Sequence, residues 1–332
     1  MSTDPVSPPS WNVVGHAWAV GLLQRAVAAD QLSHAYLVTG PPGVGRTTLA
    51  RALAGQLLCE SEAACGDCRA CRLVASGNHP DLHVVESEAP GASLKIDQVR
   101  DLQRQLALTP VEGRWRVVIL RRFEEASTGA ANALLKTLEE PPGYVVILVL
   151  STDADRLLPT IISRCQQIAL RPLPIATVQQ ALVERWGADP AQAEVLAHLS
   201  GGRLGWAVHM LEDGAALERR AQGLDDLERL LGASTVERFR YAERQARDAG
   251  AVQEMLDLWI GWWRDVLLVA SGADAPLTNV DQQGRLADQA RRFGVARSTA
   301  MVSALRDTGE RIRRNANPRL ALEVLMLDLP RA

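Results

Sequence analysis

The sequence predicts an α/β domain with a mainly parallel sheet, followed by a small helical domain and a larger all-helical domain. Three observations lead to this prediction. Short apolar runs alternate with helical patterns in the first half, a glycine-rich loop joins the first run to a helix, and no convincing strand follows residues 171–174. Strands that read as continuous apolar runs and alternate with helices are typical of parallel sheets covered on both faces.

Length and composition limit the classes of protein to consider. A chain of 332 residues suits two or three domains, and 47% hydrophobic residues are enough for sizeable cores. The net charge of −3 excludes a bulk polycation, so any contact with nucleic acid requires local clusters of Arg and Lys. Apolar runs such as 145–150 are too short to span a bilayer, and the N-terminus lacks a signal-peptide pattern. We therefore expect a cytoplasmic protein without membrane segments.

Five β-rich runs predict the strands of the α/β domain. They are Ala35–Val38, Leu82–Val85, Arg116–Leu120, Val145–Leu150 and Gln166–Leu170. Apolar side chains at helical spacing predict three helices between these strands. Their faces are Leu49, Leu53 and Leu57; Ile96, Val99 and Leu102; and Leu134, Leu135 and Leu138. Pro141 and Pro142 end the third helix.

The pattern changes at the Pro-rich segment 171–174, which predicts a linker. From Thr177 to about Leu211 the sequence is helical with an interruption at Ser200-Gly201-Gly202, and from about Ala215 it is helical again. The sequence therefore predicts four parts. They are a loose tail at 1–10, the α/β domain at 11–170, the small helical domain at 171–212 and the larger one at 213–332.

A phosphate-binding loop is predicted where the first strand meets its helix. Residues 40–47 fit the pattern GxxxxGK[ST], except that arginine replaces the lysine. Glycines let backbone N–H groups face an anion, and the helix N-terminus adds a favourable dipole. Arginine keeps the charge, but its forked guanidinium does not simply replace a compact ammonium. The candidate phosphate ligands are Gly40, Gly43, Gly45, Arg46 and Thr47. The alternative is a glycine-rich turn that binds no nucleotide.

The end of the strand 116–120 argues against ATP hydrolysis. Hydrolysis needs carboxylates there to hold Mg²⁺ and to position water, but Arg121 and Arg122 occupy the place. Two unit charges ~4 Å apart interact by ~4 kcal/mol at an effective dielectric of ~20, so a reversed sign excludes the metal. Glu124 and Glu125 come about 10 Å further along an extended chain. We expect no hydrolysis, whereas ATP binding stays open.

Four stretches closely resemble those of bacterial DNA polymerase III clamp-loader subunits. They are Ala130–Pro142 (AANALLKTLEEPP), Leu158–Cys165 (LPTIISRC), Ser33–Leu37 (SHAYL) and Asn315–Leu320 (NANPRL). The resemblance spans nearly the whole chain. It implies that the α/β domain is an AAA+ domain, that the small helical domain is its lid, and that the last domain is a collar which packs beside the collars of other subunits.

The family contains motor subunits, called tau/gamma, and related subunits without the motor residues. By resemblance, motor subunits carry lysine in the loop, Asp-Glu after the strand, and a lid arginine that senses the γ-phosphate. This chain has Arg46, Arg121-Arg122 and Gly205 at those places. Arg203 lies two residues before the third place and cannot face the same way on a helix. Because the three departures agree, the chain resembles the members that do not hydrolyse ATP.

The resemblance also implies that Arg164 is an arginine finger. In the family, the arginine of the Ser-Arg-Cys element projects into the ATP site of the neighbouring motor subunit and stabilises charge on the transferred phosphoryl group. Guanidinium suits this role because it stays charged and forks onto phosphate oxygens. The alternative is an ordinary arginine paired with a surface carboxylate. We expect Cys165 to be a buried small apolar residue beside it.

Four cysteines within thirteen positions predict a structural zinc site. They are Cys59, Cys65, Cys68 and Cys71. A similar zinc module follows the loop helix in the family, usually with a longer first spacer than in segment 59–71. A closed set of four sulfurs leaves no open position for chemistry, so the expected role is structural. Unliganded reduced cysteines are the alternative. We expect His79 and His83 to be structural instead of metal ligands.

Two further surfaces are candidates for contact with DNA and with other subunits. Arg100 and Arg104 share one face of a predicted helix, and the equivalent helix in clamp loaders lines the spiral that tracks DNA. A solvated basic face is the alternative. Near the C-terminus, Trp262 and Trp263 are adjacent in the sequence. Because both cannot face one core, we expect some apolar surface there to dock another subunit.

Together these features predict a subunit that holds a fixed place in a hetero-oligomeric clamp loader and supplies Arg164 in trans. The expected partners are tau/gamma and delta subunits, with the sliding clamp contacted indirectly and primed DNA through the assembled complex. One alternative is an active motor ATPase of the same family. Another is a free-standing zinc protein that binds nucleic acid without partners.

Overall fold

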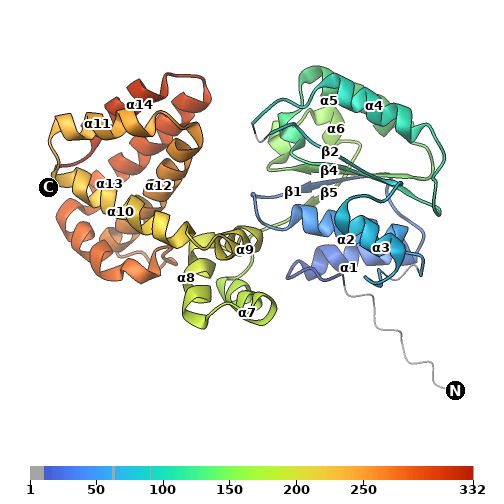
Figure 1. Cartoon of the computed structure of the whole chain (residues 1–332), viewed down its shortest axis with the longest axis horizontal. Coiled ribbons are helices and arrows are strands. Elements are labelled where there is room, and N and C mark those ends of the chain that lie inside the picture. Colours follow the sequence, from blue (N-terminus) through green and yellow to red (C-terminus); the bar gives the residue numbers. More distant parts are fainter. Residues whose placement is uncertain (1–10, 62–63, 90, 332) are drawn as a thin grey trace. The chain divides into compact units, whose positions relative to one another are not determined.

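The computed structural model divides the chain into two compact units (Figure 1). It describes residues 11–61, 64–89 and 91–331. Within these, the first unit comprises 11–177 with 202–206, and the second comprises 178–201 with 207–331. The predicted tail at 1–10 lies outside the described residues, and the division into AAA+ domain, lid and collar stays a prediction. Among the described residues, no helix is both long and apolar enough to cross a membrane.

The first unit is built on a five-stranded sheet with the order β2-β3-β4-β1-β5. The strands are β1 (Ala35–Thr39), β2 (Leu82–Val85), β3 (Arg116–Leu120), β4 (Val145–Ser151) and β5 (Gln166–Ala169). Every pair of neighbouring strands is parallel. Each predicted run therefore forms a strand, and the predicted parallel sheet is confirmed.

Helices cover both faces of this sheet (Figure 1). Those on one face are α1 (Ala17–Ala28), α2 (Arg46–Leu58) and α3 (Arg69–Ser76), and those on the other are α4 (Ile96–Leu106), α5 (Thr128–Glu139) and α6 (Pro159–Ile162). Side chains of β1 alternate between the two cores, with Tyr36 and Val38 in one and Ala35 and Leu37 in the other. Burial on both faces explains the continuous apolar runs.

The remaining helices follow the sheet without any strand among the described residues. They are α7 (Ile175–Trp186), α8 (Pro190–Ser200), α9 (Leu204–Glu212), α10 (Ala216–Gly232), α11 (Thr235–Gln245), α12 (Ala249–Ser271), α13 (Gln283–Arg313) and α14 (Pro318–Asp328). The predicted interruption falls between α8 and α9, where Gly201 and Gly202 have positive φ. Gly294 has a non-helical backbone and kinks α13.

The prediction that tryptophans expose an apolar surface on the second unit is wrong. Trp259, Trp262 and Trp263 are 0%, 1% and 0% exposed. The reason is that α12 packs against α10, α11 and α13, so neighbouring helices cover adjacent positions on different sides of it. The indole of Trp262 also donates to Gln289 Oε1 at 2.8 Å.

A buried arginine ties the second unit together. Arg238, on α11, is 3% exposed and has no carboxylate partner among the described residues. Its guanidinium donates to five backbone carbonyls at the ends of α10 and α14. These belong to Leu230, Leu231, Met326, Leu329 and Pro330. A cation is favourable at the C-terminal end of a helix, and here one cation serves two ends.

Candidate functional site

The loop between β1 and α2 has the backbone of a phosphate-binding loop. Gly40, Gly43 and Gly45 have φ of 143°, 80° and 113°, a region that favours glycine. A Cβ on Gly40 would lie 2.5 Å from the carbonyl oxygen of Leu170. Helix α2 begins at Arg46 and continues with Thr47, so the helix N-terminus opens onto the curled loop. The five predicted phosphate ligands therefore lie in one segment with the predicted geometry.

Arg46 is a partly buried cation at the start of α2. Its Nη1 is buried and has no hydrogen-bond partner in the described part of the chain. Burial lowers the pKa of Arg46, the negative charge of Glu124 opposes this shift, and Arg121 adds to it. A buried guanidinium nitrogen without a partner is unfavourable, so an anion on the loop would relieve it.

The end of β3 carries two arginines, and neighbouring acids are already bonded to them. Arg121 Nη1 lies 3.1 Å from Glu86 Oε1, and Arg122 Nη1 lies 2.8 Å from Glu86 Oε2. Arg122 Nε also lies 3.0 Å from Glu125 Oε2. Glu86 and Glu125 thus neutralise two guanidinium groups, which leaves these two acids poorly placed to anchor Mg²⁺.

Glu124 and Glu125 lie in a 3-10 turn, η1 (Phe123–Glu125), instead of on an extended continuation of β3. Glu125 accepts a hydrogen bond from Ser87 Oγ. Burial works to raise the pKa of Glu125, but its hydrogen bonds and ion pair outweigh burial, and the pKa falls. Glu124 acts on Arg46, and its Oε2 is buried without a hydrogen-bond partner in the described chain. The extended-chain argument from sequence missed this acid near the loop.

The start of α9 packs directly against the phosphate loop, within the first unit. The Gly205 N–H donates to the Gly43 carbonyl at 2.7 Å. A Cβ on Gly43 would lie 2.8 Å from the backbone nitrogen of Trp206, and a Cβ on Gly205 would lie 3.0 Å from the Gly43 carbonyl oxygen. Two backbones therefore approach so closely that Gly43, with its positive φ, requires glycine, whereas a side chain at Gly205 would require its neighbour to shift. Position 205, where motor subunits carry an arginine by resemblance, has little room for a side chain.

His16 holds the loop from another side, and sequence reasoning missed it. Its Nε2 lies 2.9 Å from the carbonyl oxygen of Val44, to which an Nε2–H tautomer donates. The residue is buried and has a left-handed backbone just before α1. The sequence patterns did not predict helix α1, and the partner of His16 lies 28 residues away along the chain. Together His16 and Gly205 fix two consecutive carbonyls of the loop.

Arg164 follows α6 and is half-buried, with 34% of its side chain exposed. Its Nη2 donates to Glu139 Oε1 at 2.7 Å, and its Nη1 donates to the Thr160 carbonyl at 2.9 Å. The arginine is thus paired with an exposed carboxylate of its own chain, as the alternative predicted, and it is still accessible, while the finger role stays a prediction. Cys165 is buried, as expected, in the core between the sheet and helices α4, α5 and α6, and burial raises its pKa to about 11.

The four predicted metal ligands come together where α2 ends and α3 begins. Cys59, Cys65, Cys68 and Cys71 have all four Sγ atoms within 4.8 Å of one another. Separations of 3.6, 3.9 and 3.9 Å match the sulfur spacing of about 3.8 Å that tetrahedral zinc imposes with bonds of about 2.3 Å. The backbone N–H groups of Cys68 and Cys71 each donate to a cysteine sulfur three residues earlier. This set fits a metal ion with four thiolate ligands.

His79 and His83 are outside this cluster, as expected. His79 Nδ1 accepts the Asp81 N–H at 3.1 Å, and burial lowers the pKa of His79. Burial also lowers the pKa of His83. Both imidazoles are therefore held neutral near the edge strand β2, a structural arrangement.

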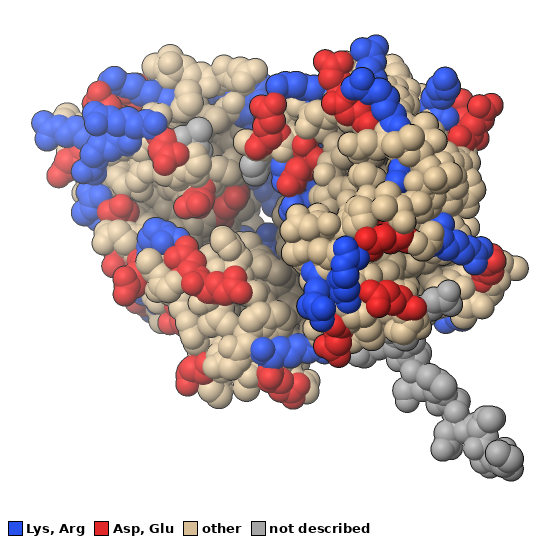
Figure 2. Space-filling model, turned by 45° about the vertical axis from the view of Figure 1, so that its right-hand side comes forward, with Lys and Arg blue, Asp and Glu red and all other residues tan. Residues whose placement is uncertain are grey.

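Arg100 and Arg104 are both exposed on α4, as predicted, but each is paired within its helix. Arg100 lies 3.4 Å from Asp97, and Arg104 contacts Asp101. Exposed pairs of this kind are weak, so a phosphate could replace the carboxylates. On the face drawn in Figure 2, basic and acidic residues are interspersed instead of forming one continuous basic field. A DNA contact at α4 stays a prediction.

Comparison with known proteins identifies the family. A family model described as DNA polymerase III, delta subunit, matches residues 15–174. DNA polymerase III subunit delta' of Pseudomonas aeruginosa is 43% identical over 221 residues, which cover 65% of this chain and 67% of that protein. DNA polymerase III subunit delta' of Bacillus subtilis is 31% identical over 314 residues, which cover 93% and 94%. The chain belongs to the DNA polymerase III delta-prime subunit family.

The chain also matches DNA polymerase III subunit tau. DNA polymerase III subunit tau of Escherichia coli is 34% identical over 213 residues, which cover 62% of this chain but only 33% of tau. The delta-prime match with Bacillus subtilis, in contrast, runs almost the full length of both proteins. The chain is thus a clamp-loader subunit of the delta-prime family, and the AAA+ assignment of its first domain stays a prediction.

Proposed function

We propose that this delta-prime family member does not hydrolyse ATP and instead completes the ATP site of a neighbouring tau/gamma subunit with Arg164. The end of β3 carries the first half of the proposal. Arg121 and Arg122 stand where magnesium-binding acids are needed, and Glu86 and Glu125 are already paired with them. The close contact at Gly205 supports the same conclusion, because it leaves little room for an arginine that senses the γ-phosphate.

The setting of Arg164 supports the second half. The residue lies in the Ser-Arg-Cys element, it is accessible, and its guanidinium retains donors that no described residue uses. The expected neighbours are tau/gamma and delta subunits. The chain is similar in sequence to subunit tau, and the family model that matches it is described as delta subunit. Such a hetero-oligomer would place the sliding clamp on primed DNA in the cytoplasm.

The decisive test is a loader reconstituted with full-length Arg164→Ala protein. Loss of an arginine finger lowers turnover by about 10³-fold or more at the site that it serves. Total clamp-dependent ATP turnover should therefore fall by the fraction of turnover that this one ATP site contributes. Wild-type turnover would refute the finger role. Separately, the isolated chain should not hydrolyse ATP, and hydrolysis that Arg46→Ala abolishes would establish the motor alternative.

Zinc is the metal that we propose for the four-cysteine cluster, and its role is structural. The sulfur spacing and the thiolate ligand set support this assignment. A set of four protein ligands leaves no position for substrate or water, so the metal would fix the segment between α2 and α3.

Phosphate contact by Arg100 and Arg104 is a further proposal. In the reconstituted loader, replacing both arginines by alanine should lower the slope of log K for DNA binding against log[salt] by about two, because two phosphate contacts are lost. Arg291→Ala is a matched control, because Arg291 is also exposed and paired with an aspartate three residues away. An unchanged salt slope in the Arg100→Ala/Arg104→Ala loader would exclude the contact.

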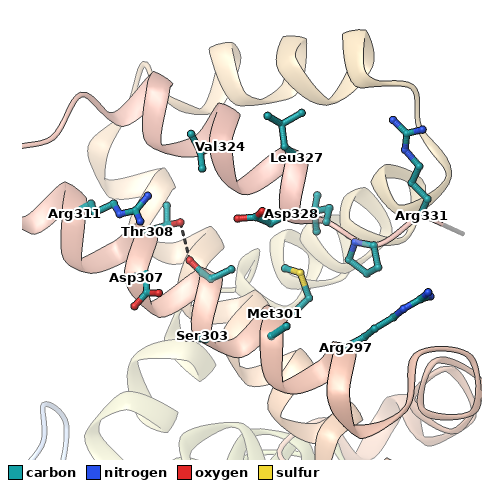
Figure 3. Close-up of a pocket in the computed structure, with 14 residues that line it drawn as sticks. Arg297, Met301, Ser303, Asp307, Thr308, Arg311, Val324, Leu327, Asp328 and Arg331 are labelled. Carbon is teal, nitrogen blue, oxygen red and sulfur yellow. Dashed lines mark hydrogen bonds between the residues drawn. The ribbon is translucent and has the colours of Figure 1, made fainter.

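The second unit offers a surface for other clamp-loader subunits. A groove of about 760 Å³ lies between α13, α14 and the C-terminal residues, and Figure 3 shows Val324 and Leu327 on the helix that borders it. With Leu320 they form an apolar stripe on α14 that is 61%, 45% and 61% exposed in chain order. We propose that this stripe packs against the helical C-terminal domain of a neighbouring clamp-loader subunit.

A further inference from the structure

The side chain of Arg164 is held in place before any neighbour is present. Nη2 donates to Glu139 Oε1 at 2.7 Å, and Nη1 donates to the Thr160 carbonyl at 2.9 Å and to Ser163 Oγ at 3.4 Å. These three bonds use three of the five guanidinium donors. Nε and one hydrogen of Nη2 have no partner in the described chain, and both belong to a fork that suits phosphate oxygens.

Glu139 is in an unusual place for a carboxylate. It is the last residue of α5, where the helix dipole disfavours negative charge. Its side chain is 51% exposed, so core packing does not explain it. Lys136 lies one turn back on the same helix, yet in the described chain Glu139 pairs with Arg164, 25 residues away. The contact therefore joins two separate elements, α5 and the end of α6.

We infer that Glu139 is the positioning residue for the finger, an inference that rests on the proposed role of Arg164. A free arginine side chain samples many rotamers, and a finger must present one of them to the transferred phosphoryl group. Glu139 and Thr160 bind one part of the guanidinium, which leaves Nε and one Nη2 hydrogen without a partner in the described chain. Because an exposed ion pair is weak, phosphate oxygens can compete for the same donors when the neighbouring site closes.

The test uses the reconstituted loader and separates kcat from KM for ATP. Glu139→Ala should lower kcat at the site that Arg164 serves about fivefold, the factor that corresponds to a contact of about 1 kcal/mol. KM for ATP should stay unchanged, because the finger acts on the reacting phosphoryl group. The kcat of Glu139→Gln should lie between those of wild type and Glu139→Ala, since the amide oxygen still accepts the hydrogen bond. Glu140→Ala is the matched control, as Glu140 is adjacent and exposed and has no ion pair in the described chain.

The outcomes separate this inference from the function on which it rests. In an Arg164→Ala background, Glu139→Ala should cause no further loss, because the two side chains act as one unit. If Arg164→Ala lowers turnover but Glu139→Ala behaves like Glu140→Ala, the positioning role is wrong and the finger stands. If Arg164→Ala itself has wild-type turnover, the proposed function fails. Glu139→Gln keeps the test valid should the alanine variant unfold.

Discussion

Single residues at the phosphate loop carry the proposal that this chain does not hydrolyse ATP. Arg46 brings a broader cation to the loop, and its Nη1 has no hydrogen-bond partner in the described chain. Gly43 and Gly205 bring two backbones into contact above it. Gly205 stands where motor subunits carry an arginine by resemblance, and a Cβ there would lie so close to the Gly43 carbonyl oxygen that the loop or the helix has to shift.

We expect Gly205→Arg to fail as a restoration of motor function. Its Cβ would lie 3.0 Å from the Gly43 carbonyl oxygen, so the first turn of α9 has to move away from the loop. Overpacking of this kind costs about 1–3 kcal/mol, which thermal unfolding of the isolated chain should detect. Gly214→Arg is the control, because a Cβ there meets nothing within 4 Å. A melting curve equal to wild type for Gly205→Arg would contradict the close contact.

Asp81 is a second residue on which the first unit depends. It is fully buried and accepts the N–H groups of Val111 and Glu112, at 2.8 and 2.7 Å, and Arg116 Nη2 at 3.1 Å. Burial works to raise the pKa of Asp81, but the hydrogen bonds and Arg116 outweigh it, and the pKa falls. The carboxylate is thus more stable ionised in the folded state than in the unfolded chain.

This shift gives stability a defined dependence on pH. The contribution of Asp81 is complete above the unfolded pKa of about 3.9 and is lost as the pH falls through the lower folded-state pKa. Asp81→Asn leaves Arg116 buried without its charge partner, so we expect a loss of about 3–5 kcal/mol at pH 7. Urea unfolding between pH 3 and pH 7 should show the difference from wild type shrinking below about pH 4. A difference independent of pH would exclude the ionic explanation.

At the scale of elements, the sequence predicts best what depends on local pattern. The strands follow from apolar runs buried on both faces, and α5 ends two residues before Pro141 because proline cannot continue it. The phosphate loop follows from its glycines. The 3-10 turn Phe123–Glu125 was not predicted, since nothing local distinguishes it from an extended chain. The burial of Trp263 depends on helices far away in the sequence.

The same limit applies to the candidate site. The cysteine cluster could be predicted because its four ligands are close in sequence and their chemistry is specific. The partners of Arg164 and of the Val44 carbonyl could not, because Glu139 and His16 are 25 and 28 residues away and single side chains leave no periodic signal. Sequence reasoning therefore found the candidate site residues and missed their hydrogen-bond partners.

Removal of the proposed zinc should loosen one segment and leave the sheet intact. Cys59 follows α2, and Cys68 and Cys71 fix the start of α3, so the metal would join two helices. We expect one zinc ion per chain by elemental analysis and faster amide exchange across residues 59–76 after chelation. In a Cys68→Ser variant, the chelator should cause no further change. If the purified protein contains no zinc and its amide exchange rates are the same with and without the chelator, the reduced-cysteine alternative is favoured.

At the scale of the whole molecule, chemistry and assembly belong to different units. The phosphate loop, the cysteine cluster and Arg164 all lie in the first unit. The apolar stripe on α14 lies in the second, on a chain whose net charge of −3 gives little electrostatic drive toward DNA. A subunit that serves a neighbour's reaction needs a firm place in a complex, and a hydrophobic contact provides this better than scattered surface charge.

The stripe on α14 gives the prediction that tests this division. Leu320→Asp/Leu327→Asp should weaken assembly with the partner subunits by at least about tenfold, since two buried anchors of an interface would become charged. The isolated variant should fold normally, because both side chains are 61% exposed in the free chain. Native mass spectrometry of reconstituted mixtures measures the assembly. Val236→Asp is the control, as Val236 is 60% exposed but lies on α11, outside the stripe. If the double variant assembles as well as this control, then the stripe is ordinary exposed surface, and the second unit must hold its neighbours by another face.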